Sequence, residues 1–80
     1  MLQVKDTFVY VVKNQGEIVL MGVSNDFEAT QDEHDHSSME FTEIRPVTED
    51  MTGEQAELVL EKLLSEYRQT HEGLNPLYNF

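Results

Sequence analysis

The chain contains no cysteine and no tryptophan, and only 5 of its 80 residues are lysine or arginine. Without cysteine it can form neither a disulfide nor a thiolate metal site, so noncovalent packing or a partner chain must stabilise the fold. No apolar run approaches the roughly 20 residues that a membrane-spanning helix requires. The first six residues also lack the basic and apolar segments of a secretory signal. We therefore expect a cytoplasmic protein that does not associate with membranes.

Acidic residues outnumber basic ones by 16 to 5, which gives a formal net charge of −11. Proteins that bind nucleic acid neutralise its phosphates with lysine and arginine. Here the five cations are scattered along the chain, at Lys5, Lys13, Arg45, Lys62 and Arg68. An acidic surface repels DNA and anionic lipid, and it favours either solubility in a salty cytoplasm or a basic partner. The composition argues against direct nucleic-acid binding and leaves a protein partner as the expectation.

Two nearly continuous apolar segments, residues 7–12 and 18–21, predict an antiparallel hairpin. The short connection between them contains Asn14 and Gly16, and the glycine can supply the positive φ that a tight turn needs. Because the apolar residues do not alternate with polar ones, we expect both faces of these strands to be covered. An apolar hairpin in so short a chain also favours a homodimer that covers the second face.

Residues 39–44 partly alternate between apolar and polar side chains, which predicts a third strand with Met39 and Phe41 on its buried face. Arg45 and Pro46 limit this strand, because proline cannot donate a hydrogen bond to a neighbouring strand and favours an edge position.

Two helices are predicted. The first is short, is capped by Ser24 or Asn25 and ends near His34. Residues 32–38 are polar throughout and are expected to form an exposed loop that overlaps its end. The second is expected over residues 53–70. It starts with a capping box, because a threonine is followed three residues later by a glutamine that can reach back to it. Its apolar residues form one stripe at helical spacing, namely Ala56, Val59, Leu60, Leu63, Leu64 and Tyr67. Gly73 is a stop signal, and the apolar residues 74–80 are expected to pack back.

The predicted order of elements is strand, strand, helix, strand, helix. We therefore expect one domain over residues 1–80, of the α+β class, with a small three-stranded antiparallel sheet flanked by helices.

Several short motifs occur in a suggestive order along this framework. Phe8-Val9-Tyr10 lies in the first strand, Leu20-Met21-Gly22 ends the second, and the segment 22–27 leads into the first helix. The same ordered set includes His34, the start of the second helix and residues 76–79. This set resembles the GIY-YIG nuclease family, whose two strand tripeptides precede a helix with a catalytic arginine. The resemblance implies a ββαβα fold and a metal-dependent endonuclease. In that family two tyrosines, the arginine and a late glutamate surround one divalent ion.

Of the five site positions that the family pattern defines, only two carry the family's residue. Tyr10 and Gly22 fit the pattern, whereas Leu20 replaces the second tyrosine, Thr30 stands at the arginine and Leu60 stands at the glutamate. An alkyl side chain cannot bind a metal ion. The resemblance therefore predicts a catalytically inactive domain that acts as a protein-binding or regulatory module, with no cofactor.

Alternatives remain open from the sequence. A shifted alignment offers Glu57 or Glu61 as the metal ligand, which would leave a residual metal-dependent DNA endonuclease that uses Tyr10. Tyr10 can equally be a strand tyrosine with a buried ring and a hydrogen-bonded hydroxyl. The glutamates of the second helix could also imitate phosphates, which would make the chain an acidic inhibitor that mimics nucleic acid.

Residues 33–36, Glu-His-Asp-His, contain a second set of metal-binding side chains. Histidines at i and i+2 of an extended loop can share a zinc, nickel or copper ion, so His34 and His36 are candidate ligands. Nothing else in the sequence identifies a third or fourth ligand, and we expect no metal site.

Overall fold

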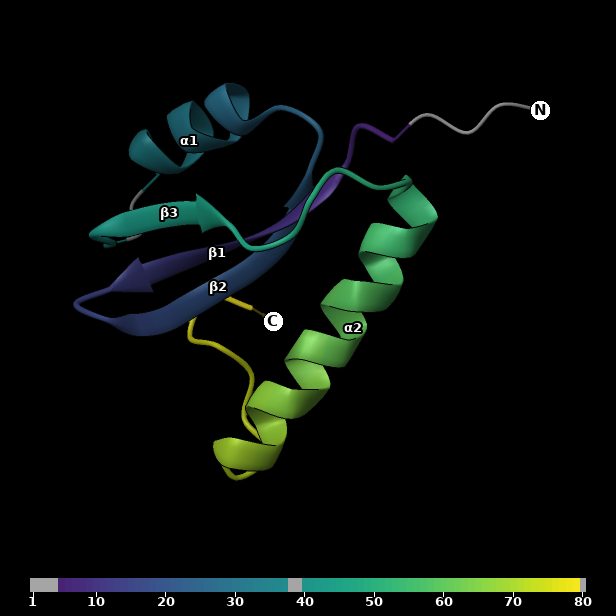
Figure 1. Ribbon diagram of the computed structural model, residues 1–80. Coiled ribbons are helices and arrows are strands. Elements are labelled where there is room, and N and C mark those ends of the chain that lie inside the picture. The colour runs from purple at the N-terminus through teal and green to yellow at the C-terminus, as the bar shows by residue number, and fades with distance from the viewer. Residues whose placement is uncertain (1–4, 38–39, 80) are drawn as a thin grey trace.

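The computed structural model describes residues 5–37 and 40–79 (Figure 1). Its elements are β1 (Phe8–Asn14), β2 (Glu17–Ser24), α1 (Phe27–Asp35), β3 (Glu43–Pro46) and α2 (Gly53–Thr70). The strands form an antiparallel sheet in the order β2-β1-β3, with α1 on one face and α2 on the other (Figure 1). The predicted α+β class and ββαβα order are confirmed. Among the described residues, no helix is long and apolar enough to cross a membrane.

The central strand β1 is buried on both faces, as its sequence predicts. Phe8, Tyr10 and Val12 belong to the hydrophobic cluster on the α1 face. Because side chains alternate along a strand, Val9 and Val11 point to the α2 face. All five are at most 7% exposed.

The hairpin turn consists of Gln15 and Gly16, with φ angles of 53° and 86°. Positive φ at both central residues is the geometry of a type I′ turn, whose twist matches that of the strands. The pairing of β1 with β2 contains one bulge near this turn. Val12 pairs with Leu20, whereas the next residue of β1 pairs with Ile18, so Val19 is the extra residue.

The third strand lies later in the chain than its sequence pattern predicts. β3 covers Glu43–Pro46 instead of residues 39–44. Its register with β1 places Ile44 opposite Val12, so Ile44 supplies the inward-facing side chain of this strand. The alternation pattern could not show this, because the register depends on contacts with a distant strand.

The residues before β3 are not part of the strand, in contrast to the prediction. Phe41 precedes the strand but is half-buried and still packs against the hydrophobic cluster. Met39 lies outside the described residues. Pro46 is the last residue of β3, on the edge of the sheet, where a missing N–H is tolerated.

Helix α1 has a different cap from the two that we expected. The carboxylate of Asp26 accepts a hydrogen bond from the backbone N–H of Ala29, at 3.1 Å. Ser24 instead supports the cap, because its hydroxyl accepts from the Asp26 N–H at 3.0 Å. The carboxylate also lies favourably at the positive end of the helix dipole. The helix continues to Asp35, one residue beyond the predicted end.

Helix α2 matches its predicted bounds and begins with the predicted capping box between Thr52 and Gln55. Gly73 has a φ of 81°, and its N–H donates to the Arg68 carbonyl at 2.8 Å, which ends the helix as predicted. Only Ala56 of the predicted apolar stripe is fully buried, and the other members are half-buried.

The C-terminal segment packs back on the sheet through Pro76 and Tyr78, as predicted, whereas the apolar side chains of Leu74 and Leu77 stay exposed. Phe80 lies outside the described residues. The Tyr78 N–H donates to the Val19 carbonyl at 2.8 Å. The Asn79 side-chain amide accepts from the Met21 N–H at 2.8 Å and donates to the Met21 carbonyl at 2.9 Å. This side chain therefore replaces a backbone partner on the outer edge of β2 and covers part of an otherwise unpaired strand.

Candidate functional site

Tyr10 and Gly22, the two matched positions of the family pattern, face each other across β1 and β2. The Tyr10 ring lies directly over Gly22. A Cβ atom added to Gly22 would lie 2.8 Å from the Tyr10 hydroxyl oxygen and 3.0 Å from two of its ring carbons. Such contacts are too short, so the glycine is explained by packing alone: it leaves room for the tyrosine ring.

The Tyr10 hydroxyl is held by α1. It forms a hydrogen bond of 3.0 Å with Nε2 of His34, and the two ring centroids are 5.7 Å apart. The edge of the half-buried His34 ring also meets Phe41, at 6.5 Å between centroids. Tyr10 therefore has the buried ring and hydrogen-bonded hydroxyl that we considered as its structural alternative. His34 lies in the last turn of α1, where the helix dipole favours a basic group.

The protonation of Tyr10 follows from this environment. Burial raises the pKa of its hydroxyl, and the negative charge of Glu33 raises it further. The phenol thus keeps its proton at neutral pH and can donate it to Nε2 of His34, in the tautomer that carries the imidazole proton on Nδ1. A tyrosine that activates water benefits from the opposite shift.

The residues at the other three site positions of the family pattern place no catalytic group near Tyr10. Leu20 is half-buried and packs against the hydrophobic cluster. The hydroxyl of Thr30 shares a hydrogen bond with that of Ser24, which joins α1 to the end of β2. Leu60 lies on α2, on the opposite side of the sheet from Tyr10 (Figure 1).

The two glutamates of the shifted alignment are equally remote from the tyrosine. Glu57 and Glu61 are exposed on α2, whereas the Tyr10 hydroxyl points toward α1. The sheet lies between them (Figure 1).

His34 and His36 do not converge. His34 belongs to α1, contrary to the extended loop that metal sharing at i and i+2 requires, and residues two apart on a helix do not face each other. Its Nε2 is bonded to Tyr10, while Nδ1 of His36 is 2.8 Å from the carbonyl oxygen of Asp32. Within residues 5–37 and 40–79, no group of three or more His, Cys, Asp or Glu side chains is arranged to hold a metal ion.

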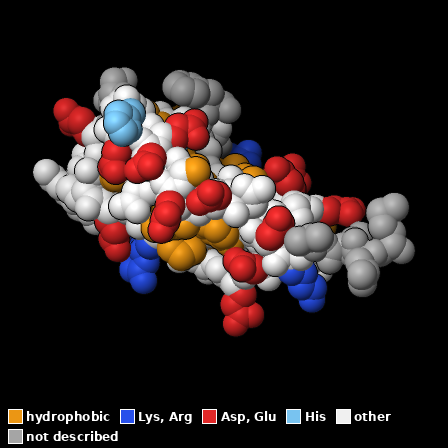
Figure 2. All heavy atoms as spheres, turned by 90° about the horizontal axis from the view of Figure 1, so that it is seen from above, with side chains coloured by type: hydrophobic (Ala, Val, Ile, Leu, Met, Phe, Trp, Pro, Cys, Tyr) orange, Lys and Arg blue, Asp and Glu red, His pale blue; other side chains and the backbone are white. Residues whose placement is uncertain are grey.

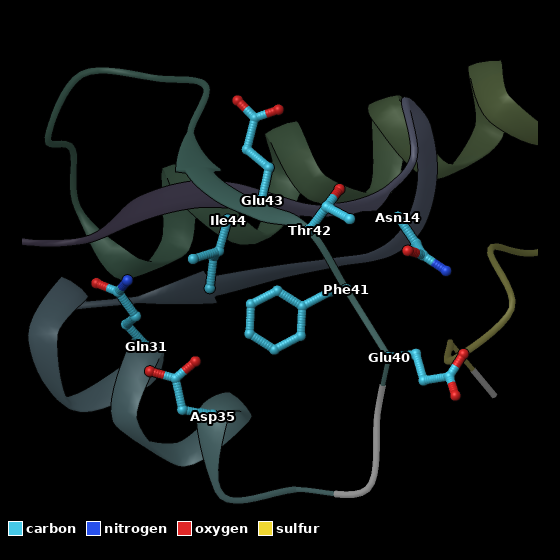
Figure 3. A pocket seen from close by; sticks show the side chains of 8 residues that line it. All are labelled: Asn14, Gln31, Asp35, Glu40, Phe41, Thr42, Glu43 and Ile44. Atoms are coloured by element: carbon cyan, nitrogen blue, oxygen red, sulfur yellow. The ribbon is translucent and has the colours of Figure 1, made fainter.

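A groove between α1 and β3 was not expected from the sequence (Figure 3). It has a volume of about 670 Å³, and we call it the acidic groove. Its lining residues are Asn14, Gln31, Asp35, Glu40, Phe41, Thr42, Glu43 and Ile44. Figure 2, which views the molecule from the α1 side, shows acidic side chains around exposed apolar atoms. The carboxylates are visible in the sequence, but the groove exists only because β3 and α1 meet there.

Among the residues that the structure describes, four large apolar side chains are exposed on other parts of the surface. They are Val47 at 46%, Leu58 at 63%, Leu74 at 66% and Leu77 at 69%. Leu58 also borders a shallow apolar hollow with Met51, Gln55 and Val59.

The site therefore consists of an enclosed Tyr10–His34 pair on one face of the sheet and an acidic groove beside it, without a convergent set of catalytic groups among the described residues. The likeness to GIY-YIG nucleases rests on short tripeptides and on their order along the chain. Comparisons of the chain with family models, with curated proteins and with solved structures give no match.

Proposed function

We propose that the chain is a catalytically inactive GIY-YIG-like domain that acts in the cytoplasm as a protein-binding or regulatory module. The observation that carries the proposal is the enclosure of the Tyr10 hydroxyl. It is the one catalytic side chain that the family pattern retains, and it is 7% exposed and hydrogen-bonded to His34. The His34 ring of α1 therefore occupies a position next to this oxygen that a water molecule or a phosphate would need for catalysis.

The chemistry of the other positions supports the same conclusion. Phosphodiester cleavage of the family type needs a metal ion to stabilise charge on the phosphate and a cation to orient it. The side chains of Leu20 and Leu60 are hydrocarbons, and the Thr30 hydroxyl is engaged with Ser24. None of these groups can take the role of a metal ligand or an arginine.

Binding is supported by the surface. The exposed side chains of Leu58, Leu74 and Leu77 offer apolar area, and the acidic groove offers charge, so a partner could use either. The apolar side chains also support a homodimer, which light scattering coupled to size-exclusion chromatography would test. A strictly monomeric particle at micromolar concentration would refute the dimer.

Two experiments test the proposed function. Plasmid DNA is incubated with wild-type protein and with Tyr10→Phe in the presence of Mg²⁺ or Mn²⁺, and we expect no cleavage by either. Cleavage by the wild type that Tyr10→Phe abolishes would overturn the proposal in favour of a residual metal-dependent endonuclease. Tagged protein is then used to capture partners from a lysate of the source organism, with elution in rising salt. We expect a stoichiometric protein that resists moderate salt.

A second function, mimicry of nucleic acid, is favoured by one feature of α2. Glu54, Glu57 and Glu61 are all exposed and lie within one sector of this helix. Such a row of carboxylates could occupy a protein that normally binds phosphates. A mimic differs from the first proposal in its partner, which would be a DNA- or RNA-handling protein that moderate salt releases, because salt screens exposed charges.

A further inference from the structure

The acidic groove combines an apolar floor with carboxylates on both sides. The half-buried side chains of Phe41 and Ile44 form the floor and pack against the hydrophobic cluster. Figure 3 shows Asp35 on the α1 side of the Phe41 ring, and Glu40 on the other side. Its volume of about 670 Å³ lies in the range of sites that hold small ligands.

These two carboxylates have no cation to neutralise them within the described part of the chain. The ion pair found there joins Glu43 to Arg45 at 3.4 Å, and no lysine or arginine lines the groove. The arrangement favours an incoming positive charge from a partner.

The position of Asp35 adds a separate argument. It is the last residue of α1, where the negative end of the helix dipole disfavours a carboxylate. Asp35 is therefore not explained by stabilisation of its own helix, and it lies on the wall of the groove.

We propose that the acidic groove binds an arginine side chain of a basic protein partner. This inference rests on the proposed binding function and names the chemistry of one contact with the partner. Because the guanidinium would also rest on the apolar floor, salt would screen only part of this contact. A guanidinium is planar, so it can stack on the Phe41 ring while its N–H groups donate to a carboxylate. It is also less strongly hydrated than the ammonium of lysine, so an apolar floor opposes its entry less. The amide oxygen of Gln31, which lies on the same side of the ring as Asp35 (Figure 3), can accept a further N–H group.

Three other hollows, formed by described residues, lack this combination. The hollow at the β3 edge includes Lys13 and Arg45, which would repel a cation. The hollow beside Leu58 has no charged lining residue, and the one between β2 and α2 has a single acidic residue, Glu66.

A short peptide tests the proposal directly. A capped Gly-Gly-Arg-Gly-Gly peptide is titrated into ¹⁵N- and ¹³C-labelled protein at low, constant ionic strength, and the same peptide with neutral citrulline serves as the ligand control. We expect saturable shifts of the Phe41, Ile44 and Gln31 resonances with the arginine peptide only. Asp35→Asn combined with Glu40→Gln should weaken binding about fivefold, as the loss of one exposed charge contact and of the attraction of a second exposed carboxylate implies.

A matched variant controls for overall charge. Asp50→Asn combined with Glu72→Gln removes the same two charges from exposed positions outside the groove and should change the affinity less than twofold. Asp35→Asn should also raise the thermal midpoint slightly, because it relieves the unfavourable dipole contact. That increase would show that weaker binding does not come from unfolding.

Three outcomes would overturn the inference: equal weakening by both pairs of substitutions, shifts spread over α2, or no saturable shift. A captured partner that still binds after Asp35→Asn and Glu40→Gln would also overturn it, while the proposed binding function would stand. Cleavage of DNA that depends on Tyr10 would refute the proposed function whatever the peptide does.

Discussion

Replacement of Gly22 by alanine tests the packing explanation of the tripeptide resemblance. The added methyl group would meet the Tyr10 hydroxyl at 2.8 Å and two ring carbons at 3.0 Å. The ring cannot simply swing aside, because it is 7% exposed and its hydroxyl is bonded to His34. The backbone of Gly22 has no positive φ, so an alanine suffers no conformational strain there.

The expected loss has two parts. Overpacking of a buried site destabilises by about 1–3 kcal/mol. Displacement of the hydroxyl from His34 removes one hydrogen bond, worth about 0.5–1.5 kcal/mol. We therefore expect Gly22→Ala to lower the free energy of unfolding by about 2–4 kcal/mol, a large share of the stability of so small a domain.

Urea unfolding followed by circular dichroism measures this change. Gly53→Ala is the matched control, because a Cβ there would be 3.9 Å from its nearest neighbour and alanine is the better helix former. It should be neutral or raise stability by up to about 1 kcal/mol. In a Tyr10→Leu background the ring is absent, and most of the cost of Gly22→Ala should disappear, as a double-mutant cycle would show.

The reasoning would be refuted if Gly22→Ala were neutral or stabilising. An alanine at an unstrained position reduces the freedom of the unfolded chain and so stabilises by about 0.4–1 kcal/mol when nothing obstructs it. Persistence of the full cost in the Tyr10→Leu background would likewise show that the ring is not the obstacle.

Three further predictions concern the cap, the C-terminal segment and the buried phenol. Thr52→Ala removes the α2 cap and should lower the free energy of unfolding by about 1 kcal/mol, as urea unfolding would measure. Thr52→Ser keeps the hydroxyl and should retain most of the stability that the cap provides. Asn79→Ala leaves both polar groups of Met21 without their amide partner, so we expect a loss of about 1–2 kcal/mol and faster hydrogen exchange at the Met21 N–H; unchanged exchange would contradict the contact. The raised pKa of Tyr10 favours the neutral phenol in the folded state. The contribution of this phenol to the free energy of unfolding is therefore complete below the ordinary pKa of 10.0, and it is lost as the pH rises through the higher folded value. Wild-type protein should therefore lose stability relative to Tyr10→Phe above about pH 10, and parallel unfolding midpoints from pH 8 to 11 would refute the shift.

The sequence determined the elements whose signals are local. The hairpin follows from two apolar runs around Gly16, which has the positive φ of its turn. The bounds of α2 follow from the capping box at Thr52 and the stop at Gly73. Each signal lies within a few residues of the structure that it specifies, because caps and turns are made by neighbours in the chain. The fold class followed from their order.

The features of the candidate site are formed by segments that are distant in the sequence, so only the tertiary structure shows them. The register of β3 put Ile44 inside and began the strand at Glu43, against the local alternation. The packing of α1 on the sheet joined His34 to Tyr10 across 24 positions of sequence. The acidic groove depends on the same packing.

Short-range patterns fix which residues are helical or extended, because backbone hydrogen bonds and side-chain periodicity are local properties. They do not fix which side chains meet, because that depends on sheet register, helix position and the volumes of distant residues. The sequence by itself therefore determined the hairpin, the bounds of α2 and the residue types at the positions that resemble the nuclease family. The tertiary structure decided that Tyr10 is buried against α1 and that an acidic groove lies beside it.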